Sequence, residues 1–207
     1  MNKRTILISR SEGRLIPWPN GLGTSREILL EERASPQGEP TFLWRLATTR
    51  IENDCPFSDL PGEDRTIVLL RGNGFELTHD SRETQTARAP FTALAFAGNW
   101  RTRCRLLDGP VDVLNLLSSR AHARCSLSPM RLLSNTHVQQ IPEGATAVYV
   151  LAGRLSADTA GGVRMTVEEG DTLQFEGGAS ACLKLCSGPA PAHLLILEAR
   201  VVQSPLP

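Results

Sequence analysis

The feature that most constrains the fold of this 207-residue chain is an internal repeat. Three pairs of short segments match in the same order, and the second copy of each lies about 80 residues after the first. The pairs are Ile67–Gly72 with Val148–Gly153, Leu94–Gly98 with Leu173–Gly177, and Leu106–Pro110 with Leu185–Pro189. The pattern predicts that a unit of about 55 residues occurs twice.

Short apolar segments bounded by turn residues fill each copy. Ala147–Leu151 and Leu194–Leu197 are too short for convincing helices and have Gly or Pro nearby, which favours strands. The chain holds 17 Gly and 14 Pro, mostly between such segments, as many turns require. Closely spaced short strands of this kind are typical of a β-sandwich or β-barrel.

The repeat also suggests where the chain divides. Ser118–Pro129 interrupts the strand rhythm with small polar residues and a proline, so the junction is expected between residues 118 and 140. We therefore predict one domain over residues 1–125 and a second over 126–207, with N-terminal strands able to pair across the two. Residues 30–40 are polar and rich in Gly and Pro, which predicts an exposed loop or hairpin tip.

Composition excludes several classes of protein. Lys plus Arg and Asp plus Glu both number 22, so the net charge is zero and the basic excess of a nucleic-acid-binding domain is missing. A hydrophobic content of 41% predicts a packed core, and no apolar stretch long enough for a membrane span or signal peptide occurs. The five cysteines lack the paired spacing of a zinc site or a disulfide framework, so we expect reduced thiols. Reduced thiols favour a cytoplasmic location for the protein.

Four ordered segments, Trp18–Ile28, Leu43–Ala47, Cys55–Arg65 and Leu107–Asn115, resemble the HutD/Ves family. They carry a Trp followed by Asn-Gly-x-Gly-Thr and Arg-Glu, a Trp-Arg strand, a Pro-Phe-Ser block ending in Arg, and a Gly-Pro strand ending in Asn. The resemblance implies an all-β chain of two cupin-like antiparallel β-barrels, a bicupin. It also implies a small bacterial protein linked to histidine utilisation.

The histidines do not form the ligand set of a metal-binding cupin. Such a site places two histidines one residue apart on a strand, where alternate side chains share a face. Here His79, His122, His137 and His193 are isolated, and His79 with Glu83 is only a fragment of such a site. We therefore expect neither a metal nor another cofactor.

Several polar residues in the family-like segments are candidates for binding a small molecule. The glycines of the Asn20–Thr24 turn allow close approach to a ligand, and only one of Arg26 and Glu27 can point into a barrel. The loop Cys55–Arg65 either displays side chains at a barrel mouth or plugs it. The full set of candidate ligand-binding residues is Asn20, Thr24, Arg26, Arg45, Phe57, Ser58, Arg65, His79 and Asn115.

Asn115 and His79 each have a structural alternative. Asn115 lies in an apolar strand, so its amide finds hydrogen-bond partners either in neighbouring groups or in a ligand. His79 is either a polar residue near a strand end or part of a pocket. Arg26, Arg45 and Arg65 are candidate clamps for an anion, because a guanidinium grips a carboxylate with two parallel hydrogen bonds.

Three functions are consistent with these residues. By its resemblance to HutD, the chain is expected to bind and sense a small acidic metabolite such as formylglutamate, with no nucleic-acid or membrane partner and with homodimerisation left open. The alternative is a cupin-type isomerase, lyase or hydrolase that uses His79 or a carboxylate as base. The candidate carboxylates are Glu27, Asp59, Asp64 and Asp112. A third function is a protein-interaction module with filled barrels.

Overall fold

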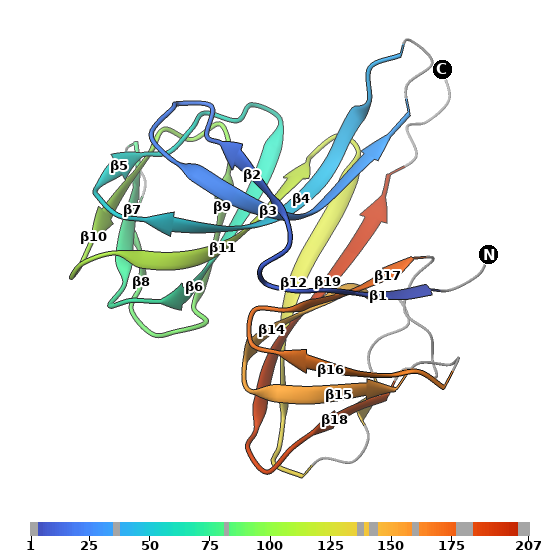
Figure 1. The fold of residues 1–207 in the computed structure, drawn as a ribbon. Coiled ribbons are helices and arrows are strands. Elements are labelled where there is room, and N and C mark those ends of the chain that lie inside the picture. The colour runs from blue at the N-terminus through green and yellow to red at the C-terminus, as the bar shows by residue number, and fades with distance from the viewer. Residues whose placement is uncertain are drawn as a thin grey trace. The chain divides into compact units, whose positions relative to one another are not determined.

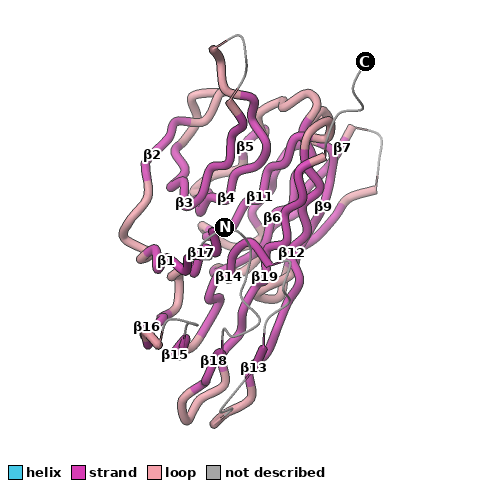
Figure 2. Tube along the Cα trace, turned by 90° about the vertical axis from the view of Figure 1, so that its right-hand side faces the viewer, coloured by secondary structure: helices cyan, strands magenta, loops and turns pink. Residues whose placement is uncertain are grey.

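The structure is a computed structural model that describes residues 4–34, 38–80, 83–135, 139–140, 145–158, 162–176 and 184–202. Every regular element in these ranges is a β-strand, from β1 (Arg4–Ile8) to β19 (Ala192–Val201), as Figure 2 shows. The predicted all-β class is therefore confirmed.

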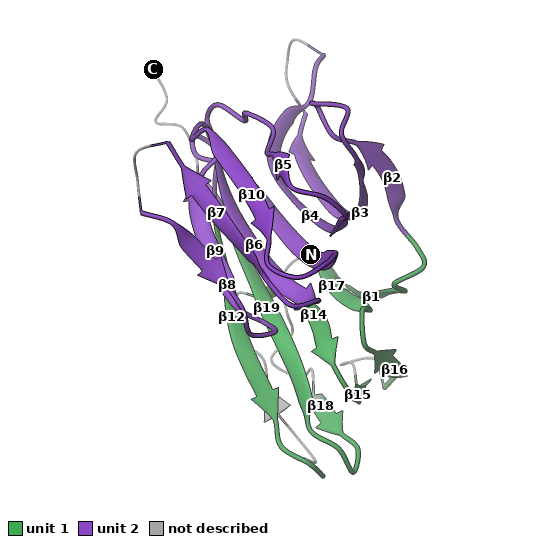
Figure 3. Cartoon of the chain, turned by 90° about the vertical axis from the view of Figure 1, so that its left-hand side faces the viewer, with its two compact units in different colours: residues 1–12, 125–200 green, residues 13–124, 201–207 purple. Residues whose placement is uncertain are grey.

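The chain forms two compact units, coloured separately in Figure 3. Unit 1 comprises Met1–Glu12 and Cys125–Arg200, and unit 2 comprises Gly13–Arg124 with the residues from Val201 onwards. The predicted division at residue 125 placed the first twelve residues in the N-terminal domain, whereas in the structure they belong to the same unit as Cys125–Arg200. The reason is strand pairing: β1 runs antiparallel to β17 (Thr172–Glu176), with Ile6 opposite Gln174.

Unit 2 consists of two sheets, whose strands are labelled in Figure 1. The six-stranded sheet has the order β2 (Arg14–Pro17), β3 (Thr24–Arg33), β4 (Thr41–Ile51), β11 (Val111–Ser119), β6 (Glu63–Arg71) and β9 (Ala93–Ala97). The four-stranded sheet has the order β5 (Cys55–Pro56), β10 (Thr102–Leu106), β7 (Phe75–His79) and β8 (Gln85–Ala87).

Unit 1 repeats this arrangement. Its larger sheet has the order β1, β17, β14 (Ala145–Ala152), β19 and β12 (Ala123–Leu132). Its smaller sheet has the order β13 (Gln139–Gln140), β18 (Lys184–Ser187), β15 (Arg154–Asp158) and β16 (Arg164–Glu168). The run β17, β14, β19, β12 matches β9, β6, β11, β4 of unit 2, so the sequence repeat corresponds to a repeated strand order.

One close backbone approach recurs in both units and explains a glycine of the repeat. Gly72 has a φ of 101°, and a Cβ there would lie 2.6 Å from the carbonyl oxygen of Pro110. Gly153 has a φ of 91°, and its Cβ would lie 2.7 Å from the carbonyl oxygen of Pro191. Only glycine combines positive φ with such an approach at no steric cost.

The core of unit 2 fills one end of the space between its sheets. Successive inward residues of a strand are two apart, so Leu69 and Ile67 on β6 and Val111 and Val113 on β11 all join one apolar cluster. The next inward residue on β6 is Arg65. Polar side chains therefore begin where the apolar core ends, and this change positions the candidate site.

One expectation needs correction, and the expectation of two closed barrels is not confirmed. Ser118–Pro129 does not end the strand rhythm, because β11 reaches Ser119 and β12 begins at Ala123. Pro129 is tolerated there because β12 is an edge strand, where a missing backbone donor breaks no ladder on its outer side. In addition, each unit has two separate sheets, and no continuous ladder closes either into a barrel within the described ranges.

The segment 30–40 is only partly a loop. β3 extends to Arg33 and β4 begins at Thr41, so the hairpin tip is shorter than expected. Residues 35–37 of this tip lie outside the described residues.

Candidate functional site

A small cavity of about 50 Å³, partly open to solvent, lies in unit 2 where its apolar core ends. Four alternate residues of β4 form one wall, because side chains two apart on a strand share a face. β3, β6, β11 and two loops supply the rest. The lining residues are Trp18, Pro19, Ser25, Arg45, Ala47, Thr49, Ile51, Phe57, Ser58, Leu60, Arg65, Asn115 and Leu117.

Arg65 is the most constrained charged group of this cavity. Its Nε and Nη2 both donate to Oδ1 of Asn115, at 3.2 and 3.1 Å. Its guanidinium carbon lies 4.3 Å from the ring centroid of Phe57 and 5.7 Å from that of Phe96, within the range of cation–π attraction. Contacts on the edge and on the face of the guanidinium hold it in one orientation.

Burial lowers the pKa of Arg65 to about 10, and the nearby charge of Arg45 adds to the effect. Glu63 opposes the shift. At neutral pH Arg65 is still a cation, and desolvation makes its charge more available to an anion than a fully hydrated charge would be.

A chain of hydrogen bonds continues from Asn115 across the cavity wall. The Asn115 Nδ2 donates to Oγ1 of Thr49 at 3.3 Å, and the Thr49 and Ser25 hydroxyl oxygens are 2.6 Å apart. Nε1 of Trp18 donates to Oγ of Ser25 at 2.9 Å. Each polar side chain is therefore oriented by the next.

Arg45 supplies a second cation. Leu117 on β11 has Arg45 of β4 as its partner on one side and Arg65 of β6 on the other. The Nε of Arg45 is buried and has no hydrogen-bond partner among the described residues. Two guanidinium groups on either side of one leucine, one of them with an unused buried donor, form a site for an acceptor.

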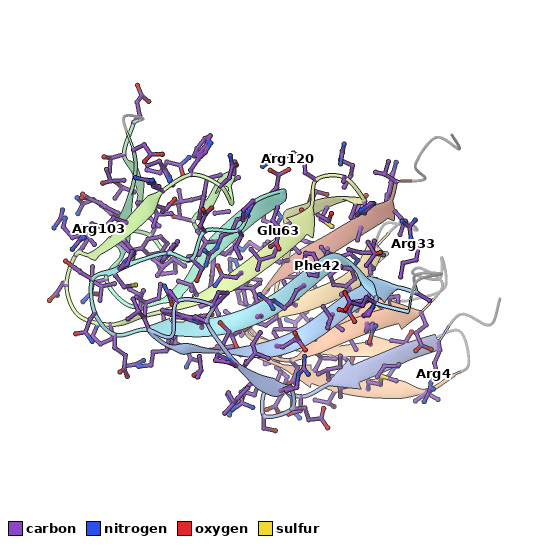
Figure 4. The ribbon with its side chains drawn as sticks, turned by 90° about the horizontal axis from the view of Figure 1, so that it is seen from above. Arg4, Arg33, Phe42, Glu63, Arg103 and Arg120 are labelled. Carbon is purple, nitrogen blue, oxygen red and sulfur yellow. The ribbon has the colours of Figure 1, made fainter. Side chains whose placement is uncertain are left out.

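Glu63 lies close to both arginines. Burial raises the pKa of its carboxyl, while Arg45 and Arg65 pull that pKa down. Its Oε2 is buried and unpartnered among the described residues, and Figure 4 shows the side chain among the strands. Glu63 does not line the cavity, but it lies two residues before Arg65 on β6 and its charge offsets part of the positive charge of the two arginines.

Two loops bound the cavity. In the first, the backbone N–H of Trp18 donates to the carbonyl of Gly23, and a Cβ on Gly23 would lie 3.0 Å from three ring carbons of Trp18. The loop after β5 is held by hydrogen bonds from the N–H of Phe57 to the Thr102 carbonyl and from the N–H of Leu60 to the Gly98 carbonyl. Both loops are tied to strands by their backbones.

Five of the nine predicted site residues line this cavity, namely Arg45, Phe57, Ser58, Arg65 and Asn115. The other four lie elsewhere. Thr24 lines a second cavity of about 490 Å³, together with Trp18 and Cys55. Asn20 shapes its own loop: its Oδ1 accepts from the N–H of Leu22, and its Nδ2 donates to the Pro56 carbonyl.

Arg26 points away from the cavity. It follows the inward Ser25 on β3, and its Nη1 donates to the Gly13 carbonyl at 3.2 Å. Its neighbour Glu27 forms an ion pair with Arg14 at 3.0 Å.

His79 is a core residue. It is 1% exposed, with Nδ1 2.9 Å from Oγ1 of Thr102 and Nε2 3.1 Å from Oε1 of Gln85. Its ring contacts the rings of Phe96 and Trp100, with centroids 4.9 and 5.3 Å away. Both ring nitrogens have partners, as a structural role requires.

The candidate acid–base carboxylates do not line the cavity either. Asp64 pairs with Arg120 at 2.8 Å and Asp112 with Arg50 at 3.1 Å, while Asp59 is exposed. Among the described residues no group of three His, Cys, Asp or Glu side chains could hold a metal ion. His137 lies outside those residues. No helix in the described parts of the chain could cross a membrane.

Four contributors to the site were not predicted: Trp18, Ser25, Thr49 and Glu63. Alternation along β4 from Arg45 contains the signal for Thr49, which lies four residues on and therefore on the same face. The others depend on loop geometry and on contacts between distant strands, which no local pattern carries.

Similar proteins place this chain in a family. The family model described as HutD matches residues 10–190. An uncharacterized 21.2 kDa protein in the hutC 3' region of Pseudomonas putida is 36% identical over 127 residues, which is 61% of this chain and 64% of the relative. Protein Ves of Cronobacter sakazakii is 30% identical over 139 residues, 66% of this chain and 70% of that protein.

Solved structures agree with this placement. HutD from Pseudomonas fluorescens SBW25, in a formate condition, has a TM-score of 0.75 at 26% identity and covers 97% of this chain and all of its own. A cupin 2 conserved barrel domain protein from Leptotrichia buccalis has a TM-score of 0.55 at 13% identity, covers 90% of this chain and 96% of its own, and shows a cupin-like fold alone. The matched residues 10–190 span most of both units, and the chain belongs to the HutD family.

Proposed function

We propose that this chain is a non-catalytic regulatory protein that binds a small carboxylate in the cavity of unit 2. The observation that carries the proposal is the pair Arg45 and Arg65 on either side of Leu117, in a cavity whose lining contains no carboxylate. An anionic ligand would supply acceptors to both guanidinium groups, including the buried Nε of Arg45.

The lining favours binding over catalysis. Apart from the two arginines it contains no ionisable side chain, so no histidine, cysteine or carboxylate is present there to act as general base. Arg65 has its pKa lowered only to about 10, which leaves it protonated at neutral pH. Both cations therefore act as fixed charges.

The relatives suggest which carboxylate to test first. One lies in a hutC 3' region, and HutD from P. fluorescens was solved in a formate condition. Formylglutamate fits both observations, because it is a metabolite of histidine utilisation and carries a formyl group and two carboxylates. We infer that it is sensed here as a metabolite of histidine utilisation, and that each unit is a variant of a cupin barrel.

Calorimetric titration tests the proposal, with formylglutamate, glutamate, urocanate, histidine and formate as ligands. We expect formylglutamate to bind more tightly than about 1 mM, a dissociation constant that corresponds to about −4 kcal/mol. Arg65→Gln should weaken binding at least tenfold, since a charge-assisted hydrogen bond contributes about 1.5–3 kcal/mol.

Arg26→Gln is the matched control, because Arg26 is also a strand arginine in unit 2 but points away from the cavity. Its affinity should equal that of the unmodified protein. If no carboxylate binds below about 1 mM, or if Arg26→Gln weakens binding as much as Arg65→Gln, the proposed site is wrong.

A further inference from the structure

Two cysteines of unit 2 face each other across neighbouring strands. Cys55 on β5 and Cys104 on β10 are directly opposed in the antiparallel ladder. Both thiols are reduced, and both belong to the apolar cluster between the sheets. Directly opposed residues project from the same face of a sheet, so the two side chains are neighbours.

The backbone hydrogen bonds show that Cys55 and Cys104 are a hydrogen-bonded pair of the antiparallel ladder. The N–H of Phe57 donates to the carbonyl of Thr102 at 2.9 Å, which continues the register that places Pro56 opposite Arg103. Hydrogen-bonded pairs recur every second residue, so Cys55 and Cys104 form the next one, with Cα atoms about 5.5 Å apart. Disulfides join Cα atoms about 4.4–6.8 Å apart, so this Cα spacing permits a bond. The Cβ atoms of opposed residues lie about 4.5–5.5 Å apart and must close to about 3.5–4.5 Å when the bond forms.

The two thiols differ in access. Cys55 is 8% exposed and lines the cavity of about 490 Å³, whereas Cys104 is fully buried. Burial raises the pKa of both thiols, that of Cys104 to about 12. Arg65 and Arg103 lower the pKa of Cys55 and Asp54 raises it. Arg103 itself is exposed (Figure 4). Because Cys55 lines a cavity and Cys104 does not, Cys55 is the thiol that a small oxidant reaches first.

We propose that Cys55 and Cys104 form a reversible disulfide when the protein meets a hydroperoxide. The Cys55 thiolate attacks the peroxide oxygen, the O–O bond breaks, and a sulfenic acid and one molecule of water or alcohol result. The Cys104 sulfur then attacks the Cys55 sulfur, and the Cys104 thiol proton passes to the sulfenic oxygen, which leaves as water. Two thiols are oxidised by two electrons, the peroxide is reduced by two, and the two thiol protons end in the products.

This site lies beside the ligand cavity. Pro56 separates Cys55 from Phe57, whose ring lies against the guanidinium of Arg65. A bond to Cys104 fixes the start of the loop that carries Phe57 and Ser58. The loop enclosed by the bond is long, so oxidation should also raise the midpoint of urea unfolding.

The experiment treats the folded full chain with hydrogen peroxide at about pH 9, where more thiolate is present than at neutral pH. Remaining thiols are alkylated, and peptides from a digest without reductant are mapped by mass spectrometry. We expect one cross-linked peptide pair that joins Cys55 to Cys104 and disappears after dithiothreitol. The unmodified protein should also unfold at a higher urea concentration after oxidation, and this shift should be missing in Cys55→Ser.

Cys125→Ser is the control variant, because Cys125 lies in unit 1 and should not affect the cross-link. The same reaction in urea gives the pattern of random pairing. The proposal is overturned if both thiols are alkylated in full after peroxide treatment, if they stop at sulfinic acid, or if the folded protein gives the random pattern. None of these measurements depends on a ligand, so they stand apart from the test of carboxylate binding.

Discussion

Replacing Asn115 by alanine tests whether the polar wall of the cavity is a connected structure. Asn115 is 6% exposed, accepts two hydrogen bonds from Arg65 and donates one to Thr49. Loss of the hydrogen bonds from the charged Arg65 should cost about 1.5–3 kcal/mol. Loss of the hydrogen bond to Thr49 adds at most about 1 kcal/mol, because Thr49 keeps its hydrogen bond with Ser25. Asn115→Ala should therefore lower the free energy of unfolding by about 2–4 kcal/mol.

Urea unfolding followed by tryptophan fluorescence measures this change. With a slope of about 1–3 kcal/mol per molar urea, the midpoint should fall by about 0.7 M or more. Asn73→Ala is the matched control, since Asn73 is exposed and donates to Asp108, and it should stay within about 0.5 kcal/mol of the unmodified protein. If Asn115→Ala also stays within that range, the reasoning about the wall is refuted.

Asn115→Asp separates stability from binding. Its carboxylate still accepts from Arg65 and should retain most of the stability, but its negative charge competes with an anionic ligand. Carboxylate affinity should fall at least tenfold, as measured by calorimetry. Unchanged affinity in Asn115→Asp would show that the ligand does not use Arg65.

Three further changes are open to test. Gly74→Ala should lower the melting temperature, with a cost above about 1 kcal/mol, because φ is 105° and the new Cβ would lie 2.3 Å from the Ala87 carbonyl oxygen; an unchanged melting temperature would contradict this. His79→Ala should cost about 2–4 kcal/mol in urea unfolding yet leave carboxylate affinity unchanged, and a loss of affinity would assign His79 to the site. Burial raises the pKa of Glu63 above 4.5, so its folded form prefers the proton, and the unmodified protein gains stability as pH falls through that raised pKa. Glu63→Gln should therefore be more stable at pH 7 and lose this advantage below about pH 4.5, in unfolding curves at several pH values; an advantage independent of pH would contradict the assignment.

The repeat predicted more of the fold than any single strand did. Gly72 and Gly153 mark equivalent turns before a close backbone approach, and the strands on either side have the same order in each unit. Strand order could be carried by the sequence because each copy repeats the same spacing of apolar segments and turns. The pairing of β1 with β17 joins residues at opposite ends of the chain, which local spacing does not encode.

The candidate site was predicted in part for a similar reason. Strand alternation places Arg26 and Glu27 on opposite faces but does not say which is inward, and that choice follows from the neighbouring strand. Arg65 and Asn115 are 50 residues apart, and they meet because β6 and β11 are neighbours. The family-like segments marked both residues, although the bond between them was not predictable.

The pairing of β1 with β17 affects the order in which the two units fold during translation. All strands of the two sheets of unit 2 lie between Arg14 and Ser119, so this unit can assemble once that part has left the ribosome. β1 is made first but must wait for β17, about 160 residues later, or about 10–30 s at ordinary rates of synthesis. During that interval β1 is an unpaired edge, and unit 2 is complete before unit 1, to which β1 belongs.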